Sequence, residues 1–351
     1  MFRHLLLPLT GGRSDAIAIS HARAIALKSE ADIRIIQVLE LPEQGAAAYP
    51  VDPVEWHALR LEAEAYLERV SRELKDAGLQ VDCSVLEGQS SEHIIHHAHQ
   101  GADLMVLPAS VFGRSQIGAL GGQALWRSYI STLLVRGEAA PKETELGAAN
   151  PSTRPADRVV PEADAWDADD AEEPAAVLPA VLDPNGLYAM VLVPLDGSKR
   201  AECVLPAVRF LTEKFGSRIV LAHVVEEPAL PRSLPPTAEE LELVQRLVAV
   251  NLAAATTYLD DVKSRVGEAA EVRLVTGRGT ASALHALVEE YAPDLLIMSA
   301  HGYGGDQTWP FGEVTTNLIG YSRTPLLLIH DRPWNERTAA PSDVTDEAWG
   351  R

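Results

Sequence analysis

The chain contains the same short pattern twice, and this internal repeat constrains its fold more than any other feature. Residues 4–14 read HLLLPLTGGRS, and residues 190–200 read MVLVPLDGSKR. Each copy is an apolar run that ends in Pro-Leu, one further residue and Gly, directly before a predicted helix start. Solenoid repeats recur every 20–50 residues or so, whereas these copies lie much further apart. The sequence therefore predicts two whole domains of one kind within its 351 residues.

The charge of the chain argues against several classes of partner. It carries 50 Asp and Glu residues against 30 Lys and Arg residues, a formal net charge of −20. Nucleic-acid binding usually requires a basic face, so we expect no nucleic-acid partner. No run of about 18 apolar residues occurs, so we expect no membrane span. The two cysteines, Cys83 and Cys203, form no spacing motif, which fits a reducing cytoplasm.

An acidic segment separates the two copies. Residues 138–187 hold twelve acidic and three basic side chains and are rich in Ala and Pro. This composition buries too little apolar surface to offset chain entropy, so we predict a disordered linker, with an acidic docking segment as the alternative. The predicted organisation is a domain over 1–137, this linker, a second domain over 188–331 and a tail over 332–351.

Apolar strands and helical patterns alternate through both copies. The predicted strands are 4–9, 33–39, 81–86, 104–107 and 132–136 in the first copy, and 190–195, 218–225, 272–275, 295–299 and 325–330 in the second. The predicted helices begin near 14, 54, 91 and 118 in the first copy, and span 199–215, 238–266, 280–291 and 314–321 in the second. This alternation predicts an α/β fold with two doubly wound, five-stranded parallel sheets and helices on both faces.

Polar and glycine-rich features of the second copy converge beyond the carboxyl ends of its strands. Ligands of open parallel sheets bind there, where the strand order reverses. Asp196 follows the first strand, Val224 ends the second, and the fourth leads through residues 298–302 to a helix start at 312–315. Glycines permit close backbone approach, and a helix start offers free N–H groups with partial positive charge, which suits phosphate. Asp196 is placed to accept bonds from a base or ribose; a turn or cap is its other interpretation.

On these residues both copies resemble universal stress protein domains, over about residues 2–137 and 188–331. The resemblance rests on the opening VPLDGS at 193–198, the strand end HVV at 223–225, and His301-Gly302 followed after nine residues by Gly312. It implies the sheet order 3-2-1-4-5 in each domain, and pairing of the domains through their last strands as an internal pseudo-dimer. It also implies a role in stress response and, in many members, ATP binding. Further association into a homodimer is expected from this analogy alone.

The resemblance also implies a set of nucleotide contacts in the second domain. The family loop Gly-x-x-Gly-x9-Gly-Ser/Thr falls on Ser299, Gly302, Gly312 and Glu313. The other implied contacts are Pro194, Asp196, Val224, Met298, His301, Val314 and Thr315. We therefore predict an ATP or adenine-nucleotide site in this domain, with Mg²⁺ or Mn²⁺ as the accompanying ion.

Glu313 departs from the family pattern, because it places a carboxylate where a hydroxyl would contact phosphate. At ~4 Å and an effective dielectric constant near 20, a like-charge pair costs about 4 kcal/mol per unit charge. A bridging divalent cation or an outward rotation of Glu313 would remove this penalty. The alternative is that Glu313 only stabilises the start of a helix.

The first copy lacks the nucleotide set. Thr10 stands where Asp196 stands in the second copy, and the loop from Leu107 has no His-Gly pair. Gly118-Ala119 replaces the phosphate end of the motif. We predict that the first domain binds no ATP and serves as a packing partner.

Two further features leave alternatives open. The histidines His93, His96, His97 and His99 lie on one predicted helix. His93 and His97 are four residues apart and therefore share a helix face, which is an arrangement that can hold a transition metal. No further ligand completes a site, so we favour a solvated helix face and predict no metal ligands. The segment 309–311, Trp-Pro-Phe, would cover a bound base, pack in an interface or anchor its loop.

No enzymatic motif occurs: Gly-x-Ser-x-Gly, Gly-x4-Gly-Lys-Ser/Thr and His-Glu-x-x-His are all absent. We therefore predict no catalytic residue. The expected function is that of a cytoplasmic stress-response protein whose second domain responds to an adenine nucleotide. One alternative is an interaction scaffold that binds no nucleotide and has an unknown protein partner. The other is a slow, metal-dependent ATP hydrolase with Glu313 or His301 as its base.

Overall fold

Ten strands from both halves of the chain join into one sheet, in the order β3-β2-β1-β4-β5-β10-β9-β6-β7-β8. The structure is a computed structural model that describes residues 1–12, 14–40, 52–109, 119–136, 187–228, 236–303 and 310–331. Apart from Leu187, the predicted linker lies outside the described residues, as does the predicted tail. The α/β class and the mostly parallel sheet agree with the prediction.

Each half alternates strands with helices. The N-terminal half contains β1 (His4–Leu9), α1 (Asp15–Ser29), β2 (Asp32–Leu39), α2 (Pro53–Asp76), β3 (Val81–Glu87), α3 (Ser90–His99), β4 (Leu104–Ala109), α4 (Ala119–Ser128) and β5 (Ser131–Arg136). The C-terminal half contains β6 (Met190–Pro194), a 3-10 turn (Ala201–Val204), α5 (Leu205–Phe215), β7 (Arg218–Glu226), α6 (Ala238–Val266), β8 (Glu271–Gly277), α7 (Thr280–Tyr291), β9 (Leu295–Ser299), α8 (Glu313–Tyr321) and β10 (Leu326–Ile329).

The two halves meet at an antiparallel seam between β5 and β10, whereas the strand pairs within each half are parallel. Leu133 pairs with Leu327 at the centre of this seam. The two predicted five-stranded sheets are therefore continuous as one ten-stranded sheet, in which each half has the strand order 3-2-1-4-5 and the halves pair through their last strands, as the resemblance implied. Two last strands left as edges would expose unpaired backbone groups, and pairing them satisfies these groups within the protein. Because the seam is antiparallel, the carboxyl ends of the two sets of strands face opposite edges of the joined sheet.

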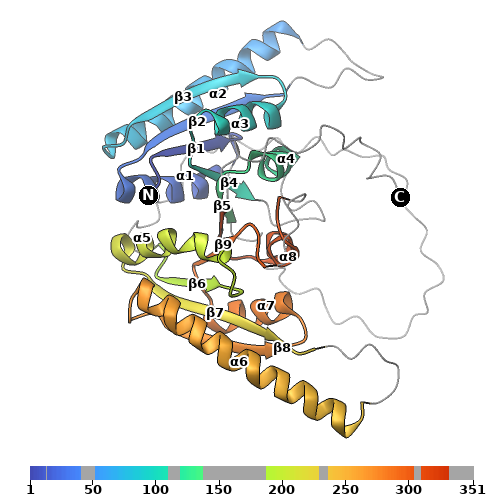
Figure 1. Cartoon of the computed structure of the whole chain (residues 1–351). Helices are drawn as coiled ribbons and strands as arrows, with labels where there is room; N and C mark the ends of the chain where they lie inside the picture. The colour runs from blue at the N-terminus through green and yellow to red at the C-terminus, as the bar shows by residue number, and fades with distance from the viewer. Residues whose placement is uncertain are drawn as a thin grey trace, which may run out of the picture.

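Helices cover both faces of the sheet (Figure 1). One apolar layer includes buried residues of α1, α2, α5 and α6, and the other includes buried residues of α3, α4, α7 and α8. The interior strands carry apolar side chains on both faces, as expected of parallel strands covered on both sides. Leu5, Leu6 and Leu7 of β1, for example, are at most 1% exposed.

The start of the first helix in the C-terminal half differs from the prediction. The sequence predicts a helix from about residue 199, but the chain forms a 3-10 turn and enters α5 only at Leu205. Pro206 occupies the first turn of α5, where its missing N–H is tolerated and its fixed φ favours a helix start. The connection that leaves β6 is therefore longer and less regular than expected.

Candidate functional site

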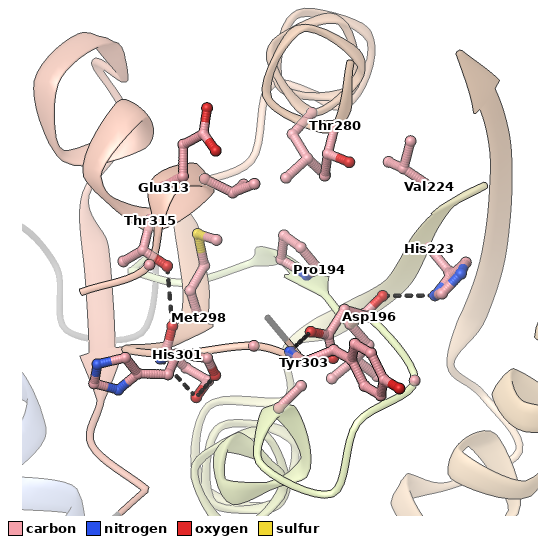
Figure 2. A pocket seen from close by; sticks show the side chains of 18 of the residues that line it. Pro194, Asp196, His223, Val224, Thr280, Met298, His301, Tyr303, Glu313 and Thr315 are labelled. Atoms are coloured by element: carbon pink, nitrogen blue, oxygen red, sulfur yellow. Dashed lines mark hydrogen bonds between the residues drawn. The ribbon is translucent and has the colours of Figure 1, made fainter. Parts of the chain in front are cut away.

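A pocket of about 1630 Å³ lies at the carboxyl edge of the C-terminal half. It lies where the strand order reverses, since β6 has β7 on one side and β9 on the other. The start of α8 and one face of α6 complete its walls. All eleven residues predicted as nucleotide contacts line it: Pro194, Asp196, Val224, Met298, Ser299, His301, Gly302, Gly312, Glu313, Val314 and Thr315. Figure 2 labels seven of them: Pro194, Asp196, Val224, Met298, His301, Glu313 and Thr315.

Asp196 joins the end of β6 to the glycine-rich loop. Its Oδ1 accepts a hydrogen bond from the backbone N–H of Ser198 at 2.9 Å, and its Oδ2 accepts one from the backbone N–H of Tyr303. Gly302 makes this approach possible, because a Cβ at that position would clash with Oδ2 and lie 3.2 Å from Cγ of Asp196. The turn interpretation of Asp196 therefore holds. The residue is nevertheless exposed and lines the pocket, so its carboxylate can still accept further bonds.

Buried hydrogen bonds hold the floor of the pocket. Ser299 Oγ donates to the carbonyl of His301 at 2.6 Å, and Thr315 Oγ1 donates to the carbonyl of Ser299 at 3.1 Å. These bonds tie the end of β9 to the first turn of α8. The hydroxyl proton of Thr315 is therefore used within the protein and not offered to a ligand.

The His301 ring is buried behind the floor. It is 1% exposed, and its Nδ1 lies 3.3 Å from Oδ1 of Asp331, whose Oδ2 accepts a bond from Arg200 Nε at 2.7 Å. Burial of Asp331 disfavours its charged form. The bonds from His301 and Arg200, with the charge of Arg200, outweigh burial and hold the pKa of Asp331 well below its ordinary value. In Figure 2 the ring points away from Pro194, so it is poorly placed as a base for a bound ligand.

Glu313 is the first residue of α8 and is exposed at the pocket. Within the described residues its carboxylate has no recorded hydrogen bond or ion pair. In Figure 2 it lies across the pocket from Asp196 and points away from it. A carboxylate in this first turn is stabilised by the positive end of the helix dipole.

Several lining residues were not predicted from the sequence. Thr280, at the start of α7, donates to Oε1 of Glu226 through its backbone N–H at 3.2 Å and its hydroxyl at 2.6 Å. The glycines Gly277 and Gly279, between the predicted strand and the predicted helix, are the signal that would have located this pair. Tyr258 of α6 also lines the pocket. Nothing in the repeating pattern of a long helix marks which of its residues faces a ligand.

One lining residue belongs to the N-terminal half. Trp126, near the end of α4, contacts the ring of Phe311 edge-to-face, with ring centroids 5.0 Å apart. Phe311 is 4% exposed and also packs against the ring of His330, with ring centroids 5.4 Å apart. Phe311 therefore both packs at the interface between the domains and anchors its own loop, which were two of the interpretations of segment 309–311. Trp309 of that segment lies outside the described residues. Counted from Gly118 and Gly312, which occupy equivalent positions in the two copies, the counterpart of Trp126 is Gly320.

The turn after β1 is organised differently from the turn after β6. Asp15 is fully buried there, and its Oδ2 accepts backbone bonds from Thr10 at 2.9 Å and Gly11 at 2.7 Å. The hydroxyl of Tyr66 donates to the same atom at 3.1 Å. Burial raises the pKa of Asp15 although these bonds oppose the shift. An internal carboxylate thus occupies this turn, while the matching loop, residues 110–118, lies outside the described residues.

The histidines of α3 bond mainly within the protein. His93 Nε2 lies 3.0 Å from the carbonyl of Glu87, and His99 Nε2 lies 2.9 Å from the carbonyl of Ser128. His96 contacts Gln100 at 2.8 Å. In the part of the chain that the structure describes, no group of three or more His, Cys, Asp or Glu residues is arranged to hold a metal ion.

Comparison with known proteins identifies the fold and the family. The model of the universal stress protein family matches residues 1–136 and 188–330, so the chain belongs to this family and contains two such domains. A comparison with curated proteins found no match. Of the helices in the described ranges, none combines the length and apolar character needed to cross a membrane.

Solved structures with the same fold cover nearly the whole chain. A universal stress protein from Archaeoglobus fulgidus is 17% identical, with a TM-score of 0.56, over 95% of this chain and 97% of that one. A protein from Pseudomonas aeruginosa described as a putative universal stress protein is 10% identical, with a TM-score of 0.54, over 94% and 93%. A universal stress protein solved in complex with cAMP is 22% identical, with a TM-score of 0.28, over 42% and 99%.

Proposed function

We propose that this chain is a cytoplasmic stress-response protein whose second domain is a regulatory module for an adenine nucleotide. One observation carries the proposal. The eleven residues selected from the sequence as nucleotide contacts all line one pocket at the reversal of strand order. The resemblance implied these contacts, and the location is the one that open parallel sheets use for ligands.

The lining gives each part of an adenine nucleotide a plausible environment. Pro194, Val224 and Met298 offer apolar surface to a base. The exposed carboxylate of Asp196 can accept hydrogen bonds from ribose hydroxyls. The first turn of α8 offers backbone N–H groups to a phosphate, and a divalent cation would be needed to offset the charge of Glu313 there.

Regulation would act through the pairing of the two domains. A ligand shifts a conformational equilibrium only if it binds two arrangements with unequal affinity. The pocket wall includes Trp126 from the other domain, so a ligand that fills the pocket has a route to favour one arrangement. Association into a homodimer belongs to the same proposal and rests on analogy.

The alternative of a scaffold without nucleotide is favoured by a specific observation: the carboxylate of Glu313 has no basic partner among the residues that the structure describes. The hydrolase alternative is less supported, because the ring of His301 is committed to Asp331. Glu313 would then be the base, and replacing it would abolish metal-dependent turnover.

The test is calorimetric titration of the full chain with ATP, ADP and AMP, with and without Mg²⁺ or Mn²⁺. Asp196→Ala should abolish binding, whereas Asp294→Ala should not. Asp294 is a matched control because it also accepts a backbone bond, from Met190 at 2.8 Å, but is not part of the pocket lining. Failure of the wild-type chain to bind any nucleotide under these conditions, with binding restored in Glu313→Ser, would favour the scaffold.

A further inference from the structure

Among the described residues, the pocket lining is richer in carboxylates than in basic side chains. It includes Asp196, Glu226 and Glu313 and the histidines His223 and His301, but neither Lys nor Arg. The basic side chain recorded beside this group, Arg278, pairs with Glu227, the neighbour of Glu226, at 3.4 Å. The bonds that Asp196 and Glu226 accept come from backbone N–H groups and one hydroxyl, which carry no net charge.

The α8 end of the pocket, where a phosphate chain would lie, also lacks a strong anion site. The first turn of a helix attracts anions, but Glu313 already places a negative charge on that turn. The hydroxyl of Thr315, the nearest alternative donor, is used by the carbonyl of Ser299. A phosphate there would gain backbone N–H bonds and meet a carboxylate at the same time.

The wall beside this end is aromatic. Phe311 precedes α8 by two residues, and Trp126 contacts it from the first domain. Pro310 extends this surface along the pocket. This wall therefore offers apolar surface and no cation to a phosphate.

We propose that the pocket recognises the adenosine part of its ligand and that, without a divalent cation, each added phosphate weakens binding, so that the pocket discriminates against free ATP. This inference rests on the proposed function, because it requires an adenine ligand in this pocket. Each added phosphate brings negative charge into a cavity that already holds three carboxylates. At low ionic strength the Debye length exceeds 10 Å or so, so all three carboxylates act on the ligand.

The experiment is calorimetric titration of the full chain with adenosine, AMP and ATP in metal-free buffer of low ionic strength. We expect affinity to fall with each phosphate, so that adenosine binds at least about tenfold more tightly than ATP. Added Mg²⁺ should strengthen ATP binding and leave adenosine binding unchanged. Glu313→Gln should reduce the gap between adenosine and ATP by about threefold or more, since it removes the nearest charge but preserves the shape.

The matched control is Glu239→Gln, which removes the same charge from an exposed residue in the first turn of α6, outside the pocket lining. It should leave the gap unchanged. ATP binding as tightly as adenosine without metal would overturn this inference and leave the proposed function intact. Binding of none of the three ligands by the folded wild-type chain, with or without Mg²⁺, would overturn both.

Discussion

A buried histidine between the two domains makes the stability of the protein depend on pH. His21 of α1 is 4% exposed, and its Nδ1 lies 2.6 Å from the hydroxyl of Tyr188, which is fully buried at the start of the second domain. The two rings lie 5.4 Å apart. Burial lowers the pKa of His21 from 6.5 to about 4, because the charged imidazolium loses its hydration there.

The sign and size of the effect follow from this shift. The folded state favours the neutral ring, so its stability contribution is complete above pH 6.5 and falls as the pH drops toward 4. A difference of about 2.5 pKa units corresponds to about 3 kcal/mol in total. Of this, about 2 kcal/mol should be lost by pH 5, when the unfolded chain binds the proton and the folded chain does not.

Urea unfolding at pH 7.5 and pH 5.0 measures the effect. We compare the wild-type chain with His21→Gln, which cannot titrate, and with His57→Gln, which removes an exposed histidine of α2. Between the two pH values the wild type and His57→Gln should each lose about 2 kcal/mol more free energy of unfolding than His21→Gln loses. All other titrating groups are shared by the three proteins, so their effects cancel in the comparison. Equal losses of the free energy of unfolding in all three proteins would therefore refute the assignment to His21.

Three further substitutions test separate parts of the structure by the free energy of unfolding in urea. Gly302→Ala should cost about 1.5–3 kcal/mol, because the new Cβ displaces Asp196 and breaks a charge-assisted bond. Gly320→Ala, inside α8 and with nothing within 4 Å of its Cβ, should instead stabilise the protein by about 0.5–1 kcal/mol, because alanine favours a helix more than glycine does; equal effects would contradict the close approach of Gly302 to Asp196. Tyr258→Phe should stabilise the protein by about 1 kcal/mol, since its buried hydroxyl lacks a hydrogen-bond partner among the described residues, and destabilisation would show a missed partner. Phe311→Ala should destabilise by about 3–5 kcal/mol through the cavity left at the domain interface, and a loss below about 1 kcal/mol would mean that the ring is not packed there.

The strands were predictable because buried parallel strands are continuous apolar runs. β1 has the predicted bounds, His4–Leu9, and the other strands begin or end within about two residues of prediction. The pairing of β5 with β10 was expected from the family resemblance alone, because the residues of these strands do not indicate it. An apolar last strand shows that its faces are buried, but it does not show whether its open edge is covered by another element or paired with another strand. The structure of the two halves together distinguishes these cases.

Part of the candidate site was also predictable from the sequence, and part was not. Asp196 was found because it follows β6 within two residues, and the start of α8 was found from the spacing of Gly302 and Gly312 that the resemblance rests on. Tyr258 and Trp126 were missed, because they reach the pocket from a helix face and from another domain. The orientation of the His301 ring could not be predicted from the sequence either, because it depends on a contact with Asp331, thirty residues later in the chain.

The one-sided contribution of Trp126 has a consequence for how two copies of a domain can specialise. The antiparallel seam brings the end of α4 beside the pocket of the second domain, and symmetry would bring the end of α8 beside the first. In an assembly of identical subunits, any residue placed at one of these positions appears at both. In this chain a tryptophan occupies one and Gly320 the other. Covalent linkage thus lets the first copy carry a residue that lines its neighbour's pocket while the second copy carries a different residue at the matching position, an asymmetry closed to a pair of identical subunits.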